Sequence, residues 1–80
     1  MTRGDVQTRL TRVFREVFRN GDLELQDSVT AKDVAGWDSL NHVKLVLAVE
    51  AEFDCRFTLR EIGRPQNVGD LMDLILKKVG

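Results

Sequence analysis

The sequence predicts an all-α fold: a small bundle of three main helices plus one short helix, with a long loop after the first helix. Apolar residues recur at helical spacing in three segments of the chain. There is no tyrosine, only one proline and few clusters of β-branched residues, which argues against a sheet. Eighty residues, 42% hydrophobic and 31% charged, suit a single folded domain spanning residues 1–80.

The first helix is expected at the start of the chain. Its apolar stripe is formed by Val6, Leu10, Val13, Phe14, Val17 and Phe18. We expect Thr2 or Asp5 to cap its start, and Asn20-Gly21 to end it, because glycine adopts the left-handed terminal conformation without strain. Residues 22–36 then form a long loop. Three apolar residues are expected to pin this loop onto the core: Leu23, Leu25 and Val29.

A second helix is expected from its cap, Asp38, to Phe53 or Asp54, and it is apolar over most of its circumference. One apolar sector contains Leu40, Val43, Leu47 and Ala51. The other contains Leu45, Val46, Val49 and Phe53. The narrow strip between them, which we expect to face solvent or a partner, contains Asn41, Lys44, Ala48 and Glu52. A helix with two apolar sectors packs against several neighbours, so this helix is expected at the centre of the bundle.

Two further helices are expected near the C-terminus. Thr58 and Glu61 form a capping box that opens a very short helix, which Gly63 ends. Asn67 caps a final helix with Lys77-Lys78 near its C-terminal end, where the helix dipole favours positive charge. The inner face of that helix contains Val68, Leu71, Met72, Ile75 and Val79.

The charge pattern gives no reason to expect a nucleic-acid or membrane partner. The formal net charge is −1, and the five arginines among residues 1–20 indicate the solvated face of the first helix. No apolar run approaches the roughly 20 residues that span a bilayer. Cys55 is the only cysteine, so no intramolecular disulfide can form and a reducing, cytoplasmic location is expected.

Ser39 is the residue whose chemistry the local sequence leaves unexplained. In the run Gly36-Trp37-Asp38-Ser39-Leu40 the helix cap is already supplied by Asp38, so the Ser39 hydroxyl is exposed and has no evident structural task. Asp38, Ser39 and His42 could suggest a catalytic triad, since Ser39 and His42 lie three residues apart on one helix. Asp38 is needed at the cap, however, no second loop offers an oxyanion hole, and 80 residues leave little room for a cleft. We expect no catalysis by the chain itself.

Cys55 and His42 do not supply a metal site, because one thiol and one imidazole are too few ligands. Cys55 is expected to be a small, partly buried thiol. The adjacent Arg56 is placed to lower its pKa.

The segment around Ser39 resembles the phosphopantetheine attachment segment of acyl carrier proteins. The resemblance rests on Asp38-Ser39-Leu40, followed by Val43, Leu45-Val46 and Glu50-Ala51-Glu52-Phe53. The order of helices and the long loop extend it over nearly the whole chain. It implies an acyl-carrier-protein-like fold in which Ser39 carries 4′-phosphopantetheine, transferred from coenzyme A by a separate phosphopantetheinyl transferase.

The resemblance implies a carrier without catalysis of its own. The thiol of the arm holds an acyl group as a thioester and presents it to acyl-loading, condensing or modifying enzymes. Trp37 is expected to anchor the loop against the bundle. Candidate partner-recognition residues are Asp38, Leu40, Asn41, His42, Lys44, Ala48 and Glu52. Candidate lining residues of an acyl pocket between the second and third helices, which would equally suit an ordinary core, are Val43, Leu47, Leu59 and Ile62.

One feature departs from the carriers of bacterial fatty-acid synthesis, which usually have an acidic stripe along the second helix. Here that strip contains Lys44, and Glu52 is its only acid. Charge complementarity selects partners, so we predict a monomeric carrier of a specialised pathway, such as polyketide or modified-acyl biosynthesis. Two alternatives stay open: a peptidyl or aminoacyl carrier of the nonribosomal type, and a non-carrier helical interaction module in which Ser39 is merely a cap.

Overall fold

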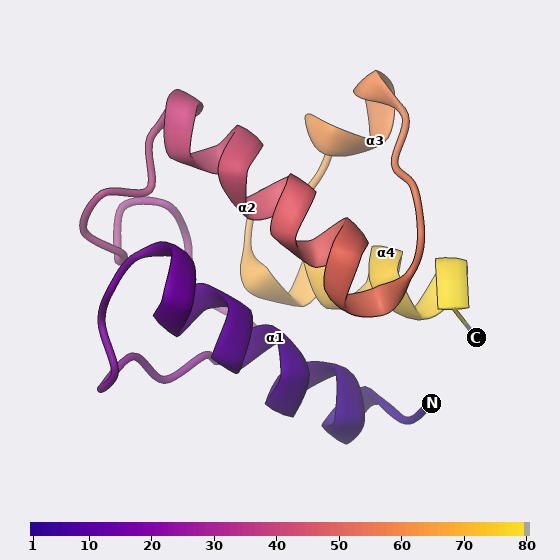
Figure 1. Ribbon diagram of the computed structural model, residues 1–80, viewed down its shortest axis with the longest axis horizontal. Coiled ribbons are helices and arrows are strands. Elements are labelled where there is room, and N and C mark those ends of the chain that lie inside the picture. The colour runs from indigo at the N-terminus through magenta and orange to yellow at the C-terminus, as the bar shows by residue number, and fades with distance from the viewer. Residues whose placement is uncertain (80) are drawn as a thin grey trace.

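The computed structural model in Figure 1 describes residues 1–79 and contains four helices. They are α1 (Arg3–Val17), α2 (Ser39–Phe53), the short α3 (Leu59–Ile62) and α4 (Val68–Val79). Residues 1–79 include no strand, and a long loop joins α1 to α2. The prediction of three main helices, one short helix and a long first loop is therefore confirmed.

The three main helices share one apolar core. α1 packs against both α2 and α4. In Figure 1, α2 returns antiparallel to α1, and the long loop connects the two helices at the end of the molecule opposite the chain termini. The core consists of apolar side chains from all three main helices and the loop: Val6, Leu10, Val13, Phe14, Leu25, Leu45, Val49, Phe53, Val68, Leu71, Met72 and Ile75.

The start of α1 is capped as the sequence predicts, and its end is not. The Thr2 hydroxyl accepts from the amide of Asp5 at 3.1 Å, and the Asp5 carboxylate accepts from the amide of Thr2 at 3.2 Å. These bonds lower the pKa of Asp5. At the other end the left-handed residue is Arg19 (φ 52°), not Gly21. The amide of Asn20 reaches back to the carbonyl of Arg15 at 3.0 Å, a bond that closes the helix one turn earlier than the glycine.

The long loop is attached to the core through apolar side chains and to α4 through its backbone. Leu25 is buried, and Leu23 and Val29 pack against the core, which confirms their predicted role. The amides of Val68 and Gly69 donate to the carbonyls of Val29 and Asp27 at 2.8 and 3.0 Å. A Cβ atom at position 69 would lie 3.2 Å from the Asp27 carbonyl oxygen, so glycine permits this close approach.

The C-terminal half follows the predicted caps. Thr58 and Glu61 form the capping box of α3, and Gly63 is its C-cap. The Asn67 side chain accepts from the amide of Asp70 at 2.8 Å, at the start of α4. α3 is then tied to the end of α4 by an ion pair between Lys78 Nζ and Glu61 Oε1 at 2.7 Å.

Candidate functional site

Ser39 is the first residue of α2 and is exposed. The preceding residue, Asp38, caps the helix: its Oδ1 accepts from the amide of Asn41 at 2.9 Å. Within residues 1–79 the Ser39 hydroxyl has no hydrogen-bond partner. The expected combination of a capped helix and an unengaged serine hydroxyl is therefore present.

The turn before Ser39 is held by the side chain of Asn41. Gly36 has a φ of 89°, a conformation that favours glycine. Its carbonyl accepts from the Asn41 side-chain amide at 2.6 Å and from the amide of Asp38 at 2.9 Å. Asn41, predicted as a partner-recognition residue, thus has a structural task in fixing the turn.

Trp37 anchors this turn to the core, as predicted. Its ring makes an edge-on contact with Phe14 at a centroid distance of 5.2 Å, and a tilted contact with Phe18 at 6.1 Å. Phe14 lies in the C-terminal half of α1 and Phe18 directly follows that helix, so the position of Ser39 depends on packing against a segment distant in sequence.

Both ring nitrogens of His42 are hydrogen-bonded to residues other than Ser39. Trp37 Nε1 donates to His42 Nδ1 at 3.0 Å, and His42 Nε2 lies 3.1 Å from the carbonyl oxygen of Ile62. With both ring nitrogens engaged elsewhere, no imidazole is available to take a proton from the Ser39 hydroxyl. The geometry therefore excludes a serine–histidine pair in this arrangement.

An open hollow of about 400 Å³ borders Ser39. Its walls come from the loop, the start of α2 and the connector before α4: Ala31, Trp37, Asp38, Ser39, His42, Pro65 and Gln66. A larger groove of about 570 Å³ lies elsewhere, between α1 and loop residues Glu24 and Leu25, and does not involve Ser39.

The orientation of α2 differs from the prediction. The strip expected to face solvent turns partly toward α1: Ala48 packs against the core, and Glu52 binds Arg9 Nε at 2.7 Å and Arg12 Nη2 at 3.1 Å. The Glu52 side chain is only 23% exposed. Arg9 also donates to the Glu52 carbonyl and stacks over the Phe53 ring at 4.8 Å. Of the predicted recognition residues, the exposed ones are Asp38, Leu40 and Lys44.

The residues predicted to line an acyl pocket lie at or near the surface, so the alternative that they are ordinary core is wrong for three of the four. Val43, Leu47 and Leu59 are 53%, 60% and 90% exposed, and Ile62 is half-buried. Val43 and Leu47 instead continue an apolar surface from Leu40, which is 69% exposed. We call Leu40, Val43 and Leu47 the outer α2 face.

Sequence reasoning missed the role of Arg9 and Arg12, which it assigned to a solvated helix face. Their spacing of three residues places both on one side of α1 and is the one local signal that could have indicated a shared acidic partner. The pKa of Glu52 is lowered mainly by its hydrogen bond from Arg9. Another acid of α2 is also engaged, since Glu50 Oε2 accepts from the amide of Phe57 at 2.7 Å.

Cys55 is partly buried, as expected, but its pKa does not move as expected. Burial raises the pKa of the thiol, and the nearby Glu50 raises it further, so Arg56 does not activate it. Among residues 1–79 no group of three or more His, Cys, Asp or Glu is arranged to hold a metal ion. No described helix is both long and apolar enough to cross a bilayer.

No protein-family model matches the chain. Among solved structures, the fold is similar to the solution NMR structure of holo acyl carrier protein from Geobacter metallireducens. The two have a TM-score of 0.85 and 38% sequence identity, over 91% of this chain and 84% of the other.

Proposed function

The chain belongs to the acyl carrier protein family, and we propose that Ser39 is the residue that bears its 4′-phosphopantetheine arm. The unengaged, exposed hydroxyl of Ser39 at the start of α2 is the observation that carries this proposal. The protein is a non-catalytic carrier, and the arm, once bound, supplies a thiol that holds an acyl group as a thioester.

The residues around Ser39 fit such a group. The hollow of about 400 Å³ beside Ser39 gives the arm space along the surface. Free backbone N–H groups in the first turn of a helix favour a phosphate there. Asp38 holds this turn through Asn41, and Trp37 fixes the turn to α1, so the hydroxyl is presented on a rigid element.

Attachment at Ser39 is tested by intact mass after incubation with coenzyme A, magnesium and a promiscuous phosphopantetheinyl transferase. We expect a gain of one phosphopantetheine group in the wild type and none in Ser39→Ala. Ser28→Ala is the matched control, because Ser28 is the other serine and lies exposed in the loop. No gain in the folded wild type, or a gain that persists in Ser39→Ala, rejects the proposal.

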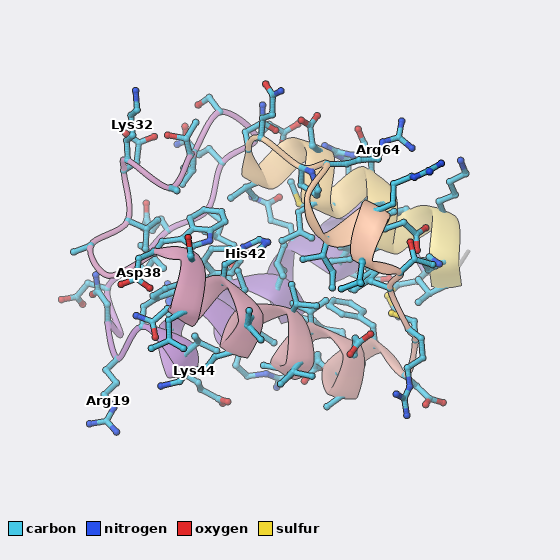
Figure 2. The ribbon with its side chains drawn as sticks, turned by 90° about the horizontal axis from the view of Figure 1, so that it is seen from above. Arg19, Lys32, Asp38, His42, Lys44 and Arg64 are labelled. Atoms are coloured by element: carbon cyan, nitrogen blue, oxygen red, sulfur yellow. The ribbon has the colours of Figure 1, made fainter. Side chains whose placement is uncertain are left out.

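We further propose that this carrier serves a specialised pathway and docks through the outer α2 face beside Lys44. The outer α2 face is apolar and exposed, whereas Glu52 and Glu50 are already engaged within the protein. Lys44 is exposed, and Figure 2 shows it extending away from the bundle. A partner that matches this surface is apolar with a carboxylate opposite Lys44, the reverse of an enzyme built for an acidic stripe.

This pathway proposal is tested with a condensing enzyme of general fatty-acid synthesis. We expect the loaded wild type to react more slowly than the host's acidic carrier, and Lys44→Glu to recover about tenfold at low salt. Lys77→Glu makes the same charge change on α4, away from Ser39, and should recover little. Wild-type turnover equal to that of the acidic carrier contradicts a dedicated pathway and leaves the attachment at Ser39 untouched.

The lone Cys55 supports a reducing, cytoplasmic location, and a monomer remains our expectation. Both are proposals. Sedimentation at several concentrations tests the monomer, and a mass that rises with concentration contradicts it.

A further inference from the structure

The ring of His42 joins three segments of the chain. Its Nδ1 is bonded to Trp37 Nε1 in the loop before α2, and its Nε2 to the carbonyl of Ile62, the last residue of α3. The Trp37 and His42 rings are nearly parallel, with an interplanar angle of 19° and centroids 6.1 Å apart. In Figure 2 the His42 ring lies among the side chains in the middle of the molecule, whereas the Lys44 and Arg64 side chains lie toward its outside.

Only one protonation state of His42 satisfies both contacts. An indole N–H can only donate and a carbonyl oxygen can only accept. Nδ1 must therefore be without a proton and Nε2 must carry one, which is the neutral Nε2–H tautomer. The other neutral tautomer opposes donor to donor at Trp37 and acceptor to acceptor at Ile62. The imidazolium keeps the bond to Ile62 and loses the one to Trp37.

α3 depends on polar contacts of this kind because it has little apolar burial. None of its four residues is buried. Its other attachments are the ion pair of Glu61 with Lys78 and, just before the helix, the bond from the amide of Phe57 to Glu50. The His42 bond is the attachment that connects the end of α3 to the helix bearing Ser39.

We propose that His42 is a positioning residue that, as the neutral Nε2–H tautomer, holds the Trp37 turn and the end of α3 together beside Ser39, and that protonation releases the Trp37 side. Ser39 and His42 border the same hollow, so the release changes the wall of that hollow. The His42 bridge, by which we mean the two hydrogen bonds from the His42 ring to Trp37 and Ile62, consists of the chain's own atoms. It does not depend on whether Ser39 is modified.

The charged groups around the two hydrogen bonds of the His42 ring are engaged elsewhere or face outward, so these bonds depend on the His42 ring itself. On the loop side, Asp38 borders the same hollow and is bonded to the amide of Asn41. On the α3 side, Glu61 is paired with Lys78, and Arg64 follows the helix and is exposed. On α2 itself, Lys44 faces outward. None of these side chains replaces either hydrogen bond of the His42 ring.

The first test is spectroscopic, because the chain has one histidine and one tryptophan. Long-range ¹H–¹⁵N NMR of the unmodified protein at pH 8 is expected to show the Nε2–H tautomer. Trp37 emission is then expected to change when the protein is acidified, because a protonated ring no longer accepts from the indole N–H and the Trp37 side is released. A Nδ1–H tautomer at pH 8, or emission that stays constant on acidification, overturns the proposal.

Two variants separate positioning from simple packing. His42→Gln keeps a hydrogen-bond donor and an acceptor but has no imidazole to protonate, so Trp37 emission should be constant with pH. The peptide group of Gly63 contains the Ile62 carbonyl. The ¹⁵N shift of Gly63 in this variant should therefore stay close to that of the wild type. Trp37→Phe removes the indole donor and should leave the Gly63 shift unchanged by acidification, since the Ile62 bond survives protonation. A change of Trp37 emission on acidification that persists in His42→Gln overturns the assignment to His42.

Discussion

At the scale of single residues, Asp38 both caps α2 and carries a negative charge, and substitutions can remove the charge while keeping the cap. Its carboxylate caps α2 by accepting from the amide of Asn41, and it places a negative charge directly before Ser39. The capping role needs an oxygen acceptor, which asparagine also supplies. Recognition by a transferase would instead need the charge. The two substitutions at this position therefore answer different questions.

Asp38→Ala is expected to lower the free energy of unfolding by about 1 kcal/mol, because the first turn of α2 loses its cap. Asp38→Asn is expected to keep most of that free energy. Urea unfolding followed by circular dichroism measures both. Equal stability of Asp38→Ala and wild type would show that the cap contributes nothing. If Asp38→Asn is stable but loads slowly with the transferase, the carboxylate acts in recognition as well.

At the scale of elements, the sequence predicted where helices start better than it predicted which of their faces is buried. The starts of α1, α2 and α3 follow from Thr2, Asp38 and Thr58, because capping is a contact between neighbours in sequence. The end of α1 was misplaced because a backbone bond to Arg15 closes it before the glycine.

The orientation of α2 could not be predicted from its own residues. Its sequence has two apolar sectors, and periodicity alone does not say which one is buried. Burial of Leu45, Val49 and Phe53 in the shared core settles it, and Arg9 and Arg12 of α1 bind Glu52, about 40 residues away in sequence. The same long-range contacts explain the candidate site: Ser39 and its cap could be predicted, whereas the outer α2 face and the His42 bridge could not.

The contact between Glu52 and Arg9 predicts a pH-dependent stability. The hydrogen bond from Arg9 lowers the pKa of Glu52 in the folded state, so the stabilisation is present above the pKa of the unfolded chain and is lost as pH falls through the folded value. Glu52→Gln is expected to lower the free energy of unfolding by about 1 kcal/mol at pH 7 and by much less near pH 3. Glu16→Gln, on the exposed side of α1, is the matched control. A loss of equal size at both pH values would contradict a charge-based contact.

At the scale of the whole molecule, the domain has little stability to spare. A chain of this length is expected to unfold with a free energy of about 4 to 12 kcal/mol. Its core is a single cluster to which α1, α2, α4 and the loop all contribute. The segment bearing Ser39 is attached to that core through Trp37 and Phe14, so the loss of a core side chain also reaches the site.

Phe14→Ala is therefore expected to lose about 3 to 5 kcal/mol, a large part of the total, because it removes a fully buried ring. Phe14→Leu fills more of the space and should lose less, so that the variant stays folded while Trp37 emission reports a looser turn. Leu47→Ala, on the outer α2 face, should change the free energy of unfolding by no more than about 0.5 kcal/mol. Urea unfolding monitored by Trp37 fluorescence compares the three, and a loss at Leu47 as large as that at Phe14 would mean that the outer α2 face is part of the core after all.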